Sequence, residues 1–294
     1  MKFNLRARLT AEFVGSAFLV AAVVGSGIMG ERLAGGNVAI ALLANTIATG
    51  AALLALILTF GPISGAHLNP AVTVADAIEH GISWPDALAY ITVQCAGGVA
   101  GAIIAHLMFG LRWYSVSTHS RHGWSLVLSE FVATFGLLSV IWGCSRLRSG
   151  AVPFAVASYI TAAYWFTAST SFANPAVTIA RSLSDTFAGI RPSDVPLFIV
   201  AQIAGALCAT FLFRWLVPNR SAYAGQVVVP HSAALRSFKE NRMSVGANFL
   251  LASGYTGQTT ETLAIPTDPS RLERVVGVPL KSYVSLSWTY YLKK

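Results

Sequence analysis

The sequence predicts an all-α membrane protein with six transmembrane helices and two re-entrant half-helices, arranged as an inverted repeat. Low charge, long uncharged runs and a repeated order of short motifs predict this fold. Only 11% of the 294 residues are charged and 54% are hydrophobic, whereas a soluble domain carries about 25% charged residues. This composition excludes a cytosolic enzyme and a disordered chain. The net charge of +8 comes from scattered basic residues that form no patch, which excludes a nucleic-acid partner.

The uncharged runs divide the chain into membrane spans. About 20 apolar residues cross the hydrocarbon core as a helix. This length predicts six spans, at residues 9–29, 38–59, 85–108, 124–144, 151–168 and 195–216. The uncharged runs 33–75 and 149–180 are too long for one span each, and both end in a segment that contains Asn-Pro-Ala.

Lys and Arg at the predicted span ends predict the orientation, because cytoplasmic loops are enriched in them. With the amino terminus inside, the inner flanks hold Lys2, Arg6, Arg8, Arg146, Arg148, Arg214 and Arg220, and the outer loops hold Arg32, Arg112, Arg121 and Arg191. The balance favours cytoplasmic amino and carboxyl termini.

Three short segments of the first half return in the same order in the second half. They are Ala11-Glu12-Phe13-Val14 with Ser129-Glu130-Phe131-Val132, the segments 67–75 with 172–180, and Gln94-Cys95-Ala96-Gly97 with Gln202-Ile203-Ala204-Gly205. Each half contains three spans, so the second copy enters the membrane from the opposite side. Inverted repeats place the site for a solute at their interface near the midplane.

The two Asn-Pro-Ala motifs predict half-helices over residues 70–80 and 175–184. Proline is favoured at the first helical position, and about ten residues cover half of the ~30 Å core. We expect the two amino-terminal ends to meet at the midplane, with Asn69 and Asn174 beside them. Two positive dipole ends at one point repel cations, which predicts a pore for uncharged solutes.

On these residues the chain resembles the aquaporin, or major intrinsic protein, family, from about residue 8 to residue 217. The resemblance rests on both Asn-Pro-Ala motifs, on Ser64-Gly65-Ala66-His67, on the paired glutamates and on the repeated order. It implies a homotetramer in the lipid bilayer with one pore in each protomer. It also implies a pore constriction formed by Asn69, Pro70, Ala71, Asn174, Pro175 and Ala176.

The resemblance further implies an outer selectivity filter at Thr49, Ala162, Ser171 and Val177. The chain departs from the family pattern here, because Val177 stands where the family usually has arginine, and large aromatic and histidine side chains are missing at positions 49 and 162. Loss of a guanidinium removes bulk, charge and several donors, so a wide, uncharged filter is predicted. Whether Arg181, one helical turn later, supplies charge to the outer vestibule is left open.

This filter, with Tyr164-Trp165-Phe166-Thr167 before the second motif, is similar to a bacterial branch found beside arsenic-resistance genes. The resemblance implies passage of metalloid hydroxides such as arsenous acid, of methylated arsenicals and of glycerol, in the inner (plasma) membrane, as part of arsenic detoxification. The alternatives are an ordinary water or glycerol facilitator, an ion-coupled secondary transporter, a membrane enzyme and a closed, adhesive member of the family. The membrane enzyme is disfavoured because no nucleophile, base and orienting group cluster together.

The ionisable and polar residues in the spans and in the first loop each have two possible roles. Glu12 and Glu130 are predicted to accept hydrogen bonds from the re-entrant loops, and the alternative is a proton relay. Gln94 and Gln202 either support the same loops or line the pore. His67 either lines the inner vestibule or makes a structural hydrogen bond.

Residues 221–294 form a predicted extension beyond a channel domain at residues 1–220. The extension carries Gly, Ser, Thr and Pro throughout, and none of its apolar runs reaches the length of a span. We expect a disordered basic tail or a small cytoplasmic module. The three cysteines, Cys95, Cys144 and Cys208, lie inside or at the edge of apolar segments, so the sequence predicts no disulfide, no metal site and no cofactor.

Overall fold

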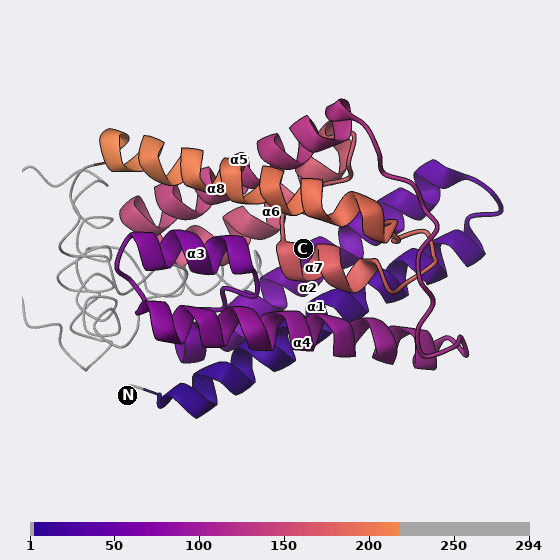
Figure 1. Ribbon diagram of the computed structural model, residues 1–294, viewed down its shortest axis with the longest axis horizontal. Coiled ribbons are helices and arrows are strands. Elements are labelled where there is room, and N and C mark those ends of the chain that lie inside the picture. Colours follow the sequence, from indigo (N-terminus) through magenta and orange to yellow (C-terminus); the bar gives the residue numbers. More distant parts are fainter. Residues whose placement is uncertain (1–2, 218–294) are drawn as a thin grey trace, which may run out of the picture. The chain divides into compact units, whose positions relative to one another are not determined.

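The computed structural model describes residues 3–217, and the predicted extension at 221–294 lies outside the described residues. Every regular element of the described part is a helix, and this part contains no strand (Figure 1). Its helices are α1 (Leu5–Leu33), α2 (Val38–Ser64), α3 (Pro70–Ile78), α4 (Trp84–Met108), α5 (Trp124–Leu147), α6 (Val152–Phe166), α7 (Pro175–Arg181) and α8 (Val195–Leu216), with 3₁₀ turns at Ser149–Ala151 and Pro192–Asp194.

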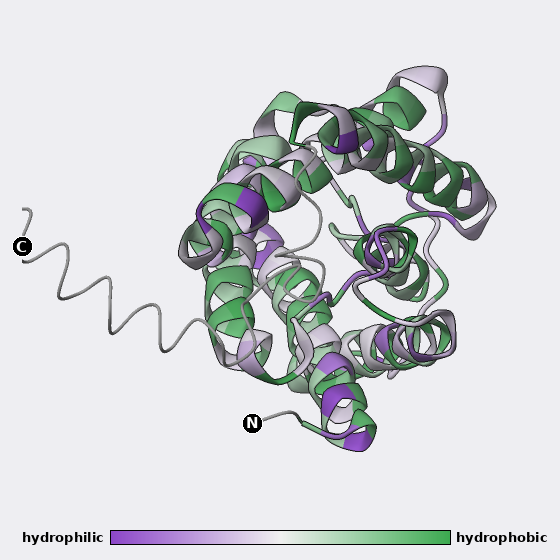
Figure 2. Ribbon diagram, turned by 90° about the vertical axis from the view of Figure 1, so that its left-hand side faces the viewer, coloured by the Kyte–Doolittle hydropathy of each residue, from purple (hydrophilic) through white to green (hydrophobic). Residues whose placement is uncertain are grey.

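Five of these helices are long and apolar enough to cross a membrane, namely α1, α2, α4, α5 and, with the turn before it, α8. The predicted span at 151–168 is α6, which has 15 residues and therefore measures only about 22 Å. A 3₁₀ turn precedes α6, and after Phe166 the chain becomes irregular. In Figure 2 the long helices surround the shorter and irregular segments, and hydrophobic residues cover most of each helix.

The half-helices α3 and α7 each begin at the proline of an Asn-Pro-Ala motif, as predicted. They have 9 and 7 residues, so both end earlier than the expected 70–80 and 175–184. In α7 the last helical residue is Arg181, after which the backbone turns.

The two halves pack in the same way. The most extensive contacts are those of α1 with α4 and of α5 with α8, which are equivalent pairs in the repeat. A Cβ atom at Gly97 of α4 would collide with the carbonyl oxygen of Phe13, and one at Gly205 of α8 would collide with that of Phe131. Small residues at these positions let the helix backbones approach closely.

Ion pairs lie at the end of the bundle where α1 begins and α8 ends (Figure 1). Glu79, directly after α3, accepts from Arg146 of α5 at 2.9 Å and also from Arg214 of α8. Arg8 of α1 pairs with Asp86 of α4 at 3.2 Å. The pairs of Glu79 join the first half-helix to the second half of the chain, whereas the Arg8–Asp86 pair lies within the first half.

We expect the glycine at the α5–α8 crossing to be required for stability. Gly205→Ala should destabilise the protein by about 1–3 kcal/mol, the usual cost of overpacking, because the new methyl group meets the backbone of Phe131. Thermal unfolding in detergent measures this change. Gly143→Ala in α5 is the matched control, since its methyl group would lie 3.4 Å from Phe213, an ordinary contact distance. Equal effects of the two substitutions would contradict the close approach at Gly205.

Candidate functional site

Asn69 and Asn174 cap the two half-helices with their side-chain oxygens. Oδ1 of Asn69 accepts from the backbone N–H of Ala71 at 2.9 Å, and Oδ1 of Asn174 accepts from those of Ala176 and Val177 at 3.0 and 3.3 Å. An asparagine at the N-cap pairs a backbone donor that the helix itself leaves open. The amide planes are thereby held at the helix starts.

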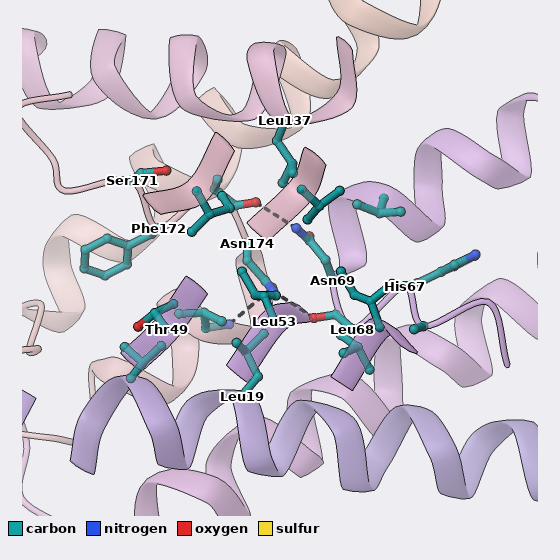
Figure 3. Close-up of a pocket in the computed structure, with 18 of the residues that line it drawn as sticks. Leu19, Thr49, Leu53, His67, Leu68, Asn69, Leu137, Ser171, Phe172 and Asn174 are labelled. Atoms are coloured by element: carbon teal, nitrogen blue, oxygen red, sulfur yellow. Dashed lines mark hydrogen bonds between the residues drawn. The ribbon is translucent and has the colours of Figure 1, made fainter. Parts of the chain in front are cut away.

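The amide nitrogens of the same residues cross to the opposite loop. Nδ2 of Asn69 donates to the carbonyl of Ala173, and Nδ2 of Asn174 donates to that of Leu68, both at 2.8 Å (Figure 3). Both asparagines line one buried cavity. A carboxamide carries two N–H groups, so each asparagine keeps one donor beyond its bond to the loop.

The loops before the half-helices contain strained backbone at equivalent positions. Ala66 and Leu68 have φ of 45° and 49°, and Ser171 and Ala173 have φ of 49° and 48°. Non-glycine residues rarely adopt this left-handed conformation, which costs of order 1–3 kcal/mol at each position. The loops hold this shape only if the surrounding hydrogen bonds impose it.

Glu12 supplies those hydrogen bonds in the first loop. Its Oε1 accepts from the Ser64 hydroxyl at 2.6 Å and from the backbone N–H of His67 at 3.0 Å. Its Oε2 accepts from the backbone N–H of Leu68 at 2.7 Å and from Gln94 at 2.8 Å. The fully buried carboxylate is thus engaged by four donors of the structure itself.

Glu130 does the same in the second loop. It accepts from the backbone N–H groups of Phe172 and Ala173, both at 2.9 Å, and from Gln202 at 2.6 Å. Gln202 also donates to Thr178 of α7 at 2.9 Å. Neither glutamate belongs to the cavity wall, and their geometry is that of loop support.

The cavity wall combines a few polar side chains with many apolar ones. Of the predicted residues, Thr49, His67, Ser171 and Val177 line it together with the two asparagines. The apolar part includes Leu19, Val23, Leu53, Ile57, Leu137 and Ile141. In Figure 3, His67 lies at one end of the cavity and Thr49 and Ser171 lie towards the other.

His67 has both of the features that were predicted as alternatives. It lines the cavity, and its ring also makes structural contacts, to the Thr73 hydroxyl at 3.1 Å and to the Asp76 carboxylate at 3.5 Å. Pro70, Ala71, Pro175 and Ala176 are buried as the first residues of their half-helices.

Ala162, the fourth residue of the predicted filter, does not line this cavity. Ala162 is exposed on α6, whereas Ile160 and Tyr164 of that helix line the cavity. Residues four apart share a face of a helix, and two positions turn the side chain by about 200°. The phenol of Tyr164 donates to the Thr49 hydroxyl at 3.2 Å. Tyr164 is a lining residue that the spacing from Asn174 did not predict.

The cavity also contains Arg181, whose position the sequence left open. This side chain is 2% exposed and belongs to the wall. Within residues 3–217, no group of three or more His, Cys, Asp or Glu residues is placed to hold a metal ion.

We expect Glu130→Gln to destabilise the protein by about 1–3 kcal/mol, the cost of unpaired buried groups. One carboxylate oxygen becomes an NH₂ group, which cannot accept from Ala173 or Gln202. Thermal unfolding in detergent measures the loss, with the exposed Glu31→Gln as the matched control. The exchange Glu130→Gln with Gln202→Glu should recover part of the stability, and a Glu130→Gln protein as stable as its parent would contradict the support role.

Comparison with known proteins identifies the family. Residues 1–152 and 143–267 match the family model described as Major intrinsic protein. The chain is 52% identical over 216 residues to Aquaglyceroporin AqpS of Rhizobium meliloti (strain 1021), which covers 74% of this chain and 92% of that protein. It is 32% identical over 221 residues to Aquaporin NIP1-4 of Oryza sativa subsp. japonica, covering 72% and 78%.

A third relative is the Probable aquaporin AqpM of Archaeoglobus fulgidus, 29% identical over 246 residues, with 74% of this chain and 99% of that protein covered. The family match extends over more than half of the chain, and it agrees with the all-helical fold and the paired Asn-Pro-Ala half-helices. The chain therefore belongs to the major intrinsic protein family, the family of the aquaporins.

Proposed function

We propose that this protein conducts metalloid hydroxides such as arsenous acid, together with glycerol and methylated arsenicals, and so contributes to arsenic detoxification. Members of its family are passive channels and not enzymes, and its relative AqpS is named an aquaglyceroporin, so the chain is a membrane channel for small neutral solutes. The proposal adds the identity of the solute to that assignment.

The observation that carries the proposal is the side chain of Val177 in the cavity wall. Val177 is buried and lines the same cavity as Ser171 and Thr49, at the position where arginine is usual in the family. Valine provides neither the length nor the donors of a guanidinium. A valine in place of an arginine at this position leaves room for a compact trihydroxide or a triol, which is broader than water.

The half-helix ends support selection for uncharged solutes. The amino termini of α3 and α7 meet at Asn69 and Asn174, so two positive dipole ends point to one region of the cavity. None of the residues in the cavity wall is Asp or Glu. An ion-coupled secondary transporter would need such ligands for its coupling ion, which disfavours that alternative.

The proposal places the channel in the plasma membrane as a homotetramer with both termini in the cytoplasm. The basic residues Arg8, Arg146 and Arg214 support this orientation, because they lie at the end of the bundle where α1 begins and α8 ends. Positive residues gather on the cytoplasmic side of membrane proteins.

We expect Val177→Arg to slow the entry of arsenous acid and glycerol into proteoliposomes at least about tenfold, equivalent to about 1.4 kcal/mol. The guanidinium would project into the cavity that Val177 lines. Light scattering after an osmotic challenge with each solute measures entry, and water is tested separately. Val177→Leu is the control, since it adds bulk without charge and should slow entry less.

If the parent protein passes only water and Val177→Arg behaves identically, Val177 does not form the filter and the proposed solute is wrong. Fast glycerol entry without arsenous acid entry would favour the ordinary glycerol facilitator.

A further inference from the structure

Arg181 places a cation in the cavity wall, four residues after Val177. Four residues are about one helical turn, so the two side chains belong to the same face of α7. Arg181 is the last residue of α7 and is buried in the wall. The chain thus carries an arginine one helical turn after Val177, the position where the family usually has one.

The guanidinium of Arg181 is held firmly on one side. Its Nε donates to the carbonyl of Ala188, and its central carbon lies 3.4 Å from the centre of the Phe172 ring. Stacking on an aromatic face stabilises a guanidinium and fixes its plane. The orientation of the remaining nitrogens is therefore set before any solute arrives.

One nitrogen of this guanidinium has no partner. Nη1 of Arg181 is buried and makes no hydrogen bond in the described structure. Among residues 3–217, no carboxylate lies within 4 Å of Arg181 to form an ion pair. A buried donor without a partner is costly, and a charged one more so, unless a ligand or water in the cavity accepts from it.

Arg121 lies on the same phenylalanine ring as Arg181 but has a structural role. It lies 4.9 Å from the Phe172 ring centre, and it donates to the carbonyls of Gly189 at 2.7 Å and Ser169 at 3.1 Å. Arg121 is not part of the cavity wall. Its donors are used by loop backbone, whereas Nη1 of Arg181 has no such partner.

Ser171 adds a second polar atom without a partner. Its Oγ is buried, unpaired and part of the same cavity wall. Figure 3 shows Ser171 and Thr49 away from the end occupied by His67. A hydroxyl both donates and accepts, so Ser171 complements a guanidinium that only donates.

We propose that Arg181 and Ser171 form the polar side of the filter in this channel. In this arrangement Nη1 of Arg181 donates to one hydroxyl oxygen of a neutral polyhydroxy solute, and Ser171 Oγ accepts from another hydroxyl of that solute. The fixed charge of Arg181 repels protons and metal cations, which Val177 cannot do. The solute contacts rest on the proposed function, whereas the exclusion of cations does not.

Two readouts in proteoliposomes separate these roles. The first is the proton leak, followed with an internal pH dye under a potassium diffusion potential. The second is the ratio of glycerol entry to 1,2-propanediol entry, two solutes that differ by one hydroxyl group. Water flux and the elution profile in detergent report folding.

Arg181→Met removes the charge and both readouts should change. The proton leak should rise at least about tenfold, and the solute ratio should fall by about fivefold, the effect of one hydrogen bond. Arg181→Lys keeps the charge and loses the planar set of guanidinium donors. Only the ratio of glycerol entry to 1,2-propanediol entry should therefore fall. Ser171→Ala should also lower the ratio and leave the leak unchanged.

Arg32→Met is the matched control. Arg32 also stacks on a phenylalanine, Phe109 at 5.2 Å, and also donates to a backbone carbonyl, but it is exposed and outside the cavity wall. It should change neither readout. In the double variant Val177→Arg with Arg181→Met, the charge returns one turn earlier and the proton leak should fall again.

An unchanged leak in folded Arg181→Met would overturn the exclusion role. An unchanged ratio in both Arg181→Lys and Ser171→Ala would overturn the solute contacts, even if Arg181→Met does not fold. If the parent conducts neither glycerol nor arsenous acid but Arg181→Met still leaks protons, the proposed function fails and the charge assignment stands.

Discussion

Every polar backbone group of the two re-entrant loops has to pair with the protein or with water in the cavity, because lipid offers no partner at that depth. This constraint explains the buried Glu12 and Glu130, whose oxygens accept from the loop N–H groups and from Gln94 and Gln202. It also explains why two strained segments persist in a region built otherwise from regular helices.

The same pairing determines what is left for a solute. The carboxylates are engaged by the loops and lie outside the cavity wall, so no acidic group remains there to couple an ion. The side-chain oxygens of Asn69 and Asn174 cap the half-helices, and each residue donates one N–H to the opposite loop. The cavity therefore offers its contents few donors, a mostly apolar wall with one arginine, and two helix dipoles, which suits passage of neutral molecules without strong binding.

The ion pairs at Glu79 join the two halves, and the glycine contacts fix the packing of helices within each half. Close packing of α1 on α4 and of α5 on α8 requires glycine at positions 97 and 205. Two arginines of the second half bind the residue that follows α3. A small displacement of either half would separate the half-helix ends, since each asparagine depends on a carbonyl of the opposite loop.

The sequence by itself determined the fold class, five of the six expected membrane spans and the starts of the half-helices. It also determined that Glu12 and Glu130 occupy equivalent positions in the repeat. Hydrophobic run length, helix-starting proline and repeated motif order are local signals. Only the tertiary structure decided which side chains of α6 reach the cavity. The spacing from Asn174 selected Ala162, whereas Ile160 and Tyr164 line the cavity, because the rotation of a helix depends on the elements packed against it. Only the tertiary structure shows that Nη1 of Arg181 has no hydrogen-bond partner. Whether a donor is paired depends on all of its neighbours in space and not on its place in the chain.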